Sequence, residues 1–257
     1  MRLSSDQILE LRANQHLLVP DFWNSETCNR TMQILGRRCT LQQPWNDFPH
    51  DPQDAALWQL FVSADLIDAA ERFLQTADLM LGGSFFQARF AGDGLDVEQP
   101  AHLDESNNTL LVEPAVGQPA YLVALSYWTN VGEGDGPTAI EVDGVERRLS
   151  VERGTVLFYS LNQPHRGTRM TGPFAQRYVS WFTYRARDAS WCGQAWFGGS
   201  GAHPGTIQFL EEATPRQRCL VGVPAPGHPY WTRETIDRVG ARYRGWDMAP
   251  YLAALSG

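Results

Sequence analysis

The chain has 257 residues, of which 43% are hydrophobic, and a net charge of −8. This length suits a single all-β barrel, and the acidity argues against a nucleic-acid groove, which needs a basic patch. All 21 basic residues are arginines, so Schiff-base chemistry on a lysine is excluded. The sequence has neither an apolar run long enough to span a membrane nor the apolar segment of a signal peptide, so we expect a cytoplasmic protein.

The first 82 residues favour helices. Helices are expected at residues 6–15, 25–38 and 64–81, the first capped by Asp6 and the last ended by Gly82-Gly83. Between the first two lies a short apolar stretch that suits an edge strand because Pro20 closes it. Residues 40–55 hold three prolines without periodicity and predict a surface loop.

The middle of the chain changes character. Short runs rich in β-branched and aromatic residues predict strands at 84–92, 121–131, 138–142, 145–151, 154–160 and 176–185. Asp143-Gly144 is the favoured two-residue hairpin turn. We therefore expect a mainly β fold with flanking helices, whose core is a double-stranded β-helix of the jelly-roll, cupin-like kind.

One domain is the simpler interpretation of residues 1–257. It would consist of a helix-rich part (1–82), a jelly-roll core (83–185) and an irregular C-terminal cover (186–257) that ends in a helix pair at 232–243 and 248–255.

The most informative short motif is His102-Leu103-Asp104. On a strand, side chains i and i+2 leave the same face about 6.5–7 Å apart, which allows both to bind one metal ion. His165 lies about sixty residues later, after an apolar strand and Pro164. Two histidines and one carboxylate form the facial triad of non-haem Fe(II) oxygenases, which keeps open positions for a cosubstrate and O₂.

Arg177 follows His165 by twelve residues, on the same strand face as Val179, Trp181 and Thr183. An arginine that points into a barrel is costly without an anion. A guanidinium holds a carboxylate bidentately, so the partner is either an acid that arrives as a ligand or a carboxylate of the protein itself. Arg177 alone does not separate these two interpretations.

These motifs resemble the phytanoyl-CoA dioxygenase-like group of Fe(II)/2-oxoglutarate oxygenases. The matching segments, which together extend over roughly residues 4–185, are 3–22, 84–94, 102–104, 134–142, 153–170 and 176–184. The resemblance implies that His102, Asp104 and His165 bind iron and that Arg177 binds the distal carboxylate of 2-oxoglutarate. It further suggests a cosubstrate contact for Gln87 and, for Tyr121, support of Arg177 from a neighbouring strand, although a core or rim role is open for both.

The resemblance also bears on the reaction. Related halogenases have Gly or Ala at the carboxylate position, so Asp104 favours hydroxylation of an unactivated C–H bond of a small molecule, with succinate and CO₂ as coproducts. Desaturation, cyclisation and epimerisation on the same centre remain open. The segment 136–149 closes directly into a hairpin, where relatives carry an insertion, so a CoA-ester substrate is not expected.

A second class of function also remains open. A non-catalytic or non-redox jelly roll that binds a metabolite would use the same histidines structurally. Two Trp-rich segments, 40–55 and 186–236, are expected either to form lids over the barrel mouth or to cover its outside. The oligomeric state is not predicted.

Overall fold

The structure of this chain is a computed structural model that describes residues 1–38, 46–47, 55–93, 97–104, 121–160, 163–186, 204–220 and 223–255. The chain forms two compact units. The first contains residues 1–102 and 116–186, and the second contains residues 103–115 and 187–257. In the described parts of the chain, no helix is long and apolar enough to cross a membrane.

The first unit contains the predicted helices and strands in chain order, together with four short elements that the sequence did not predict. Its helices are α1 (Ser5–Asn14), α2 (Ser25–Arg38), α3 (Ala55–Phe61), α4 (Ala64–Leu74) and the 3₁₀ turn η2 (Glu133–Asp135). Its strands are β1 (His16–Val19), β2 (Asn46–Asp47), β3 (Leu79–Phe90), β4 (Tyr121–Tyr127), β5 (Thr138–Val142), β6 (Val145–Arg148), β7 (Val156–Ser160), β8 (His165–Gly167) and β9 (Gln176–Ala186). The four elements that were not predicted are β2, α3, η2 and β8.

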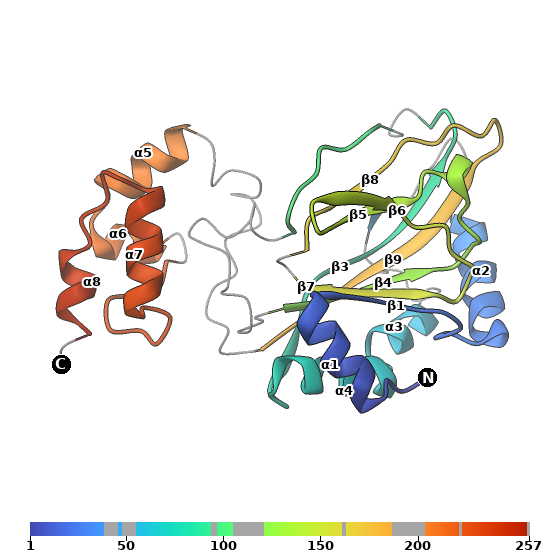
Figure 1. The fold of residues 1–257 in the computed structure, drawn as a ribbon, viewed down its shortest axis with the longest axis horizontal. Coiled ribbons are helices and arrows are strands. Elements are labelled where there is room, and N and C mark those ends of the chain that lie inside the picture. The colour runs from blue at the N-terminus through green and yellow to red at the C-terminus, as the bar shows by residue number, and fades with distance from the viewer. Residues whose placement is uncertain are drawn as a thin grey trace. The chain divides into compact units, whose positions relative to one another are not determined.

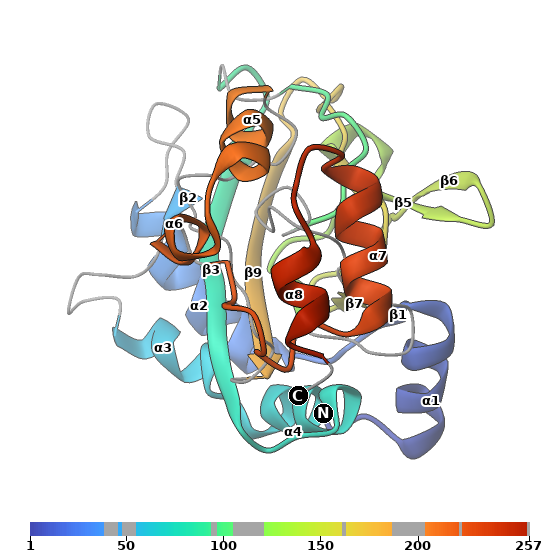
Figure 2. The same ribbon diagram turned by 90° about the vertical axis from the view of Figure 1, so that its left-hand side faces the viewer.

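Six strands form a large antiparallel sheet in the order β1-β7-β4-β9-β3-β2. Strand β1 lies at one edge of it, as Pro20 predicted. The long strands β3 and β9 run side by side in it, as Figure 2 shows. One face of this sheet packs against the helices in a hydrophobic cluster that includes Leu66, Phe73, Phe86 and Phe182. Helices α1, α3 and α4 lie on this face (Figure 1).

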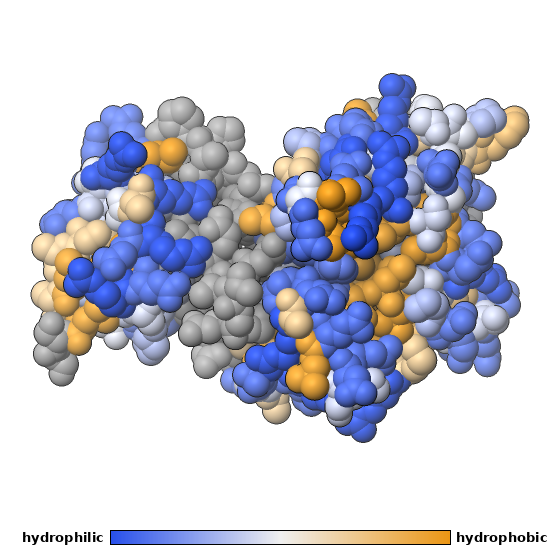
Figure 3. All heavy atoms as spheres, viewed as in Figure 1, coloured by the Kyte–Doolittle hydropathy of each residue, from blue (hydrophilic) through white to orange (hydrophobic). Residues whose placement is uncertain are grey.

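Three strands form a small sheet in the order β6-β5-β8. The predicted turn at Asp143-Gly144 is confirmed, since both residues have positive φ values (54° and 74°) and join β5 to β6. Ile140 of the small sheet shares an interior hydrophobic cluster with Val123 and Leu157 of the large sheet. The two sheets therefore enclose a common interior, which is the predicted double-stranded β-helix. Figure 3 shows that the face of the first unit turned toward the viewer is mostly hydrophilic, with groups of hydrophobic residues within it.

Two local expectations differ from the structure. The helix predicted to reach residue 81 ends at Leu74, where Gln75 takes a left-handed conformation (φ 58°). Leu79–Leu81 instead pair with β9, and Gly82-Gly83 lie at a register shift inside β3 rather than at the end of a helix. The cap of α1 is Ser4, whose hydroxyl accepts from the Gln7 amide in a capping box, rather than Asp6.

The second unit was predicted to be irregular apart from a C-terminal helix pair. That pair is present as α7 (Arg233–Arg242) and α8 (Ala249–Ala253), preceded by α5 (Pro204–Glu212) and α6 (Pro215–Leu220). These helices have a hydrophobic cluster of their own, built around Trp231, Tyr243, Trp246 and Tyr251. Tertiary burial of these rings supports short helices that would be marginal alone. Of the predicted loop at 40–55, only 46–47 and 55 are described, and within 186–236 residues 187–203 and 221–222 lie outside the described residues.

Candidate metal centre

The structure brings His102, Asp104 and His165 together. One ligand atom from each of the three lies within 4.8 Å of the others. The imidazole rings of His102 and His165 have centroids 4.6 Å apart and are inclined by 52°. His102 forms an isolated bridge with His165, and Asp104 lies in a turn rather than on a strand. Convergence therefore comes from the bridge and the turn, not from the strand alternation that the sequence predicted.

Backbone carbonyls fix the tautomer of both histidines. Nδ1 of His102 lies 3.0 Å from the carbonyl oxygen of Pro100, and Nδ1 of His165 lies 3.1 Å from that of Gln163. A carbonyl oxygen can only accept, so each Nδ1 carries the proton and donates it. In a neutral ring with this tautomer, Nε2 keeps a lone pair, which is the form in which a histidine binds a metal.

The segment before Asp104 is held against β8 by backbone hydrogen bonds. The amide of His102 donates to the carbonyl of His165 (2.9 Å), and the amide of His165 donates back (3.0 Å). Gln99 donates its amide to the carbonyl of Gly167, whose own amide donates to the Gln99 side-chain oxygen (2.9 Å). A side chain at Gly167 would collide with that oxygen, because an added Cβ would lie 2.8 Å from it. A side chain here would therefore displace the flexible Gln99 side chain and break this hydrogen bond.

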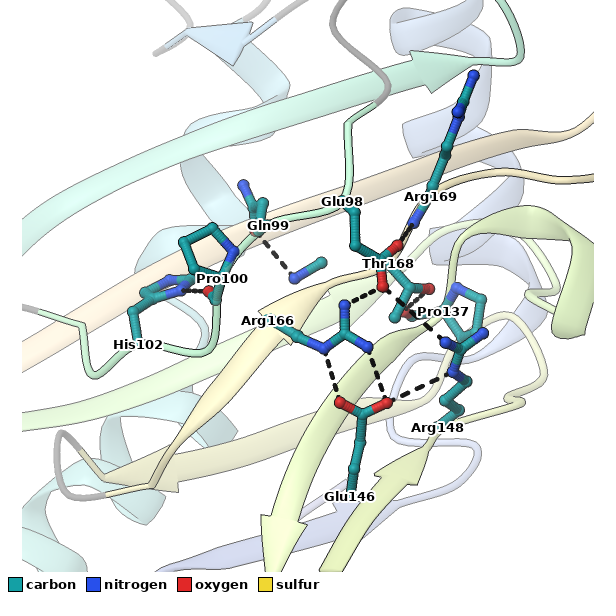
Figure 4. A network of polar contacts seen from close by, with 11 residues as sticks. Glu98, Gln99, Pro100, His102, Pro137, Glu146, Arg148, Arg166, Thr168 and Arg169 are labelled. Carbon is teal, nitrogen blue, oxygen red and sulfur yellow. Dashed lines mark hydrogen bonds and ion pairs between the residues drawn. The ribbon is translucent and has the colours of Figure 1, made fainter.

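An ionic cluster around Arg166 also holds the segment that precedes Asp104 (Figure 4). Arg166 donates to both oxygens of Glu146 on β6 (2.6 and 2.9 Å) and to Glu98. The other oxygen of Glu98 accepts from the amide of Arg169 (2.7 Å), and Arg148 approaches Glu146 at 3.5 Å. We call Glu98, Glu146, Arg148 and Arg166 the clamp. It ties the segment that carries His102 to the strand that carries His165.

The clamp shifts the pKa of its members. Hydrogen bonds from Arg166 lower the pKa of the Glu98 and Glu146 carboxyls, and the two glutamates raise the pKa of Arg166. Both carboxylates are nearly half exposed (47% and 43%), so solvent screens the pair and its contribution to stability is small. Its role here is to hold geometry.

Arg177 lies close to the candidate metal ligands. Its guanidinium donates to the backbone carbonyl of Gly136 and to the side-chain oxygen of Gln87, 3.5 Å away on β3. A Cβ built on Gly167, two residues after His165, would lie 3.8 Å from one of its nitrogens. The structure thus brings Gln87 and Arg177 together beside β8.

Tyr127 was not identified from the sequence, although it belongs to this neighbourhood. It is fully buried in the interior cluster on β4. Burial raises its pKa to about 12, while the neighbouring Thr138 side chain and the charge of Arg177 act in the opposite direction. A phenol that stays protonated at any physiological pH can donate a hydrogen bond here.

Tyr121 is not brought to Arg177. It lies at the other end of β4 from Tyr127, and its cross-strand partner on β9 is Arg185. The strand assignment was therefore correct, but the register places Tyr121 beside a different arginine. The sequence could not show this, because register depends on how β4 and β9 pair.

Tyr159 and Trp181 adjoin the histidines and were also missed as site residues. The Trp181 indole N–H donates to the Tyr159 hydroxyl oxygen (2.7 Å), which lies 3.4 Å from Nε2 of His165. The Tyr159 and His165 rings have centroids 4.6 Å apart. The alternation along 176–185, which placed Trp181 on the face of Arg177, was the available signal.

The comparisons with known proteins agree with this architecture. HygX from Streptomyces hygroscopicus, solved with nickel and 2-oxoglutarate bound, is 16% identical with a TM-score of 0.53, and the match covers 73% of this chain and 88% of that one. SnoK, a non-haem α-ketoglutarate-dependent carbocyclase from nogalamycin biosynthesis, is 14% identical with a TM-score of 0.57 and coverage of 71% and 84%. This chain shares their fold.

A third structure extends the set. EvdO2 from Micromonospora carbonacea var. aurantiaca, in complex with 2-oxoglutarate, is 12% identical with a TM-score of 0.55, and the match covers 72% of this chain and 92% of that one. No family model and no curated protein matches the sequence. The predicted jelly-roll core is thus confirmed, while the resemblance to the phytanoyl-CoA dioxygenase-like group stays a prediction.

Proposed function

We propose that this protein is an Fe(II)- and 2-oxoglutarate-dependent oxygenase that oxidises a C–H bond of a small molecule. The observation that carries the proposal is the convergence of His102, Asp104 and His165 within 4.8 Å, with both histidines held in the metal-binding tautomer. Solved proteins with this fold are described as binding iron or nickel and 2-oxoglutarate, which supports the choice of metal and cosubstrate.

The donor set fits iron better than it fits Ca²⁺ or Mg²⁺. Two imidazole nitrogens and one carboxylate oxygen are the donors of the facial triad of non-haem Fe(II) sites, whereas Ca²⁺ and Mg²⁺ prefer oxygen donors alone. The triad leaves other positions for 2-oxoglutarate and O₂. When bound, Fe(II) with 2-oxoglutarate supplies the oxidation of the substrate, coupled to formation of succinate and CO₂.

In this proposal the residues around Arg177 hold the cosubstrate. The guanidinium would pair with the distal carboxylate of 2-oxoglutarate, because its fork of donors matches a carboxylate. Gln87 orients the guanidinium from β3, and Tyr127 offers a protonated hydroxyl from β4. Tyr127 is buried in the interior cluster, whereas Arg177 and Gln87 are half-buried.

The outcome of the oxidation is a finer part of the proposal. Asp104 completes the triad, so we propose hydroxylation of a small molecule. The same donor set also suits other oxidations. Among the structural neighbours, SnoN is described as an epimerase and SnoK as a carbocyclase, so product analysis must include epimers and ring-closed products.

The first prediction tests the proposal directly. Under anaerobic conditions, Fe(II) and 2-oxoglutarate added to the protein are expected to produce the weak visible absorption of a metal-chelated cosubstrate. Admission of air should then give succinate. The variants His102→Ala and Asp104→Ala should lose both signals, because each removes one of three ligands.

The control is Arg147→Gln, on the exposed strand β6, which should behave as wild type. Succinate formation that survives His102→Ala would refute the assignment. A wild type with neither the absorption nor succinate would instead favour a metabolite-binding jelly roll.

A further inference from the structure

A second arginine faces the interior of the first unit from β9. Val179 and Trp181 belong to the interior cluster, whereas Tyr178, Phe182 and Tyr184 belong to the cluster on the helical face. Side chains alternate along a strand. Arg185 therefore lies on the interior face, at the opposite end of β9 from Arg177.

The surroundings of Arg185 make it an unusual place for a cation. Its Nε is buried and, within the described parts of the chain, has no hydrogen-bond partner. Its two cross-strand neighbours are Tyr121 on β4 and Met80 on β3. Tyr121 is only 2% exposed. The residue as a whole is half-buried, but a buried donor of a charged group that lacks an acceptor is costly. An anion beside Arg185 would remove that cost.

The two arginines lie on opposite sides of the candidate metal centre along one strand. Trp181 marks the middle, since its indole contacts Tyr159, which in turn lies next to His165. Arg177 precedes Trp181 by four residues and Arg185 follows it by four, so each Cα is about 13 Å from that of Trp181. Because the proposed cosubstrate extends from the metal toward Arg177, the side of the metal centre that faces Arg185 is left for the substrate.

We propose that Arg185 binds an anionic group of the substrate, which is therefore a small carboxylate, sulfonate or phosphate ester. The rings of Phe85 and Trp181, which face each other across β3 and β9, stack with centroids 5.3 Å apart at the middle of this face, so the substrate also carries an apolar or aromatic part. That the bound anion is the substrate rests on the proposed function. The anion site itself is tested by binding, without turnover.

The second prediction uses probes matched in shape and different in charge. Benzoate and phenyl phosphate are compared with neutral benzamide by calorimetry on the full-length protein, with and without saturating Fe(II) and 2-oxoglutarate. Occupation of the Arg177 end by 2-oxoglutarate keeps the probes away from it. We expect an anionic probe to bind wild type roughly 10- to 100-fold more tightly than benzamide, as for a charge-assisted bidentate contact.

Variants test whether the preference for anionic probes depends on Arg185. Arg185→Gln should abolish it, Arg185→Lys should retain part of it, and Arg147→Gln, which removes an exposed arginine from β6, should leave it unchanged. The proposal is overturned if charged and neutral probes bind wild type equally, if neither binds, or if Arg185→Gln keeps the preference. Loss of cosubstrate binding in wild type would contradict the proposed function instead, because the charge preference is also measured without Fe(II) and 2-oxoglutarate.

Discussion

At the scale of single residues, the close approach of two backbone segments requires a glycine at position 154. Gly154 has φ +87°, and a Cβ there would lie 2.5 Å from the carbonyl oxygen of Trp23. Its carbonyl accepts from the Trp23 amide and its amide donates to Tyr127. A glycine here joins the segment after β1 to the turn before β7 and to the end of β4.

The third prediction follows from that contact. Gly154→Ala should lower the free energy of unfolding by at least about 1–3 kcal/mol, because a left-handed conformation is combined with a backbone collision. Urea unfolding measures this change. Gly144→Ala is the matched control, since Gly144 has a similar φ of +74° but nothing within 4 Å of an added Cβ. Equal losses for the two variants would show that the collision is relieved at no cost.

At the scale of elements, the candidate metal centre depends on pairing between a segment and a strand. Residues 97–102 are bound to β8 by backbone hydrogen bonds, and the clamp joins that segment to β6 and β8. The clamp therefore positions His102 relative to His165 without touching either imidazole.

The fourth prediction concerns this positioning. Arg166→Gln should weaken Fe(II) binding by about tenfold, in the range seen when groups that orient metal ligands are removed, while the fold is kept. Calorimetric titration with Fe(II) under anaerobic conditions measures the effect, again with Arg147→Gln as control. Unchanged affinity in Arg166→Gln would mean that the backbone pairing alone holds the ligands.

The contribution of the clamp to stability should also depend on pH. Because the folded protein lowers the pKa of Glu98 and Glu146, their contribution is complete above the ordinary glutamate pKa of about 4.3. It is lost as the pH falls through the lowered values. The difference in unfolding free energy between wild type and Arg166→Gln should therefore be constant at neutral pH and vanish in acid.

At the scale of the whole molecule, the two units have separate cores. In the second unit Arg218 is 2% exposed, donates from Nε to the carbonyl of Leu210 (2.6 Å) and lies 4.1 Å from the ring centroid of Trp246. Burial of this guanidinium is compensated by backbone acceptors and an aromatic face.

The fifth prediction is that Arg218→Ala destabilises the second unit selectively. Truncation leaves carbonyls without their donor and removes a cation–π contact, which together should cost about 2–4 kcal/mol. Hydrogen exchange should show faster exchange in α5–α8, with protection of β3 and β9 unchanged. Equal loss of protection in both units would show that they unfold together.

The sequence by itself determined much of the fold. Alternating β-branched and aromatic runs and an Asp-Gly turn are local signals, so the longer strands, the β5–β6 hairpin and α2 could be predicted, whereas the short strands β2 and β8 were not. The triad was also within reach, because His102, Asp104 and His165 are chemically distinctive and stand in a recognisable order. The end of α4 could not be predicted, since Leu79–Leu81 suit either a helix or a strand until β9 pairs with them.

Only the tertiary structure decided which side chains meet. Register placed Tyr121 beside Arg185 instead of Arg177, and it placed Tyr127 near Arg177. The ion pair between Glu98 and Arg166, which are 68 residues apart, likewise could not be predicted from the local sequence. Such contacts depend on how distant strands align, and a shift of one residue would turn every side chain to the other face.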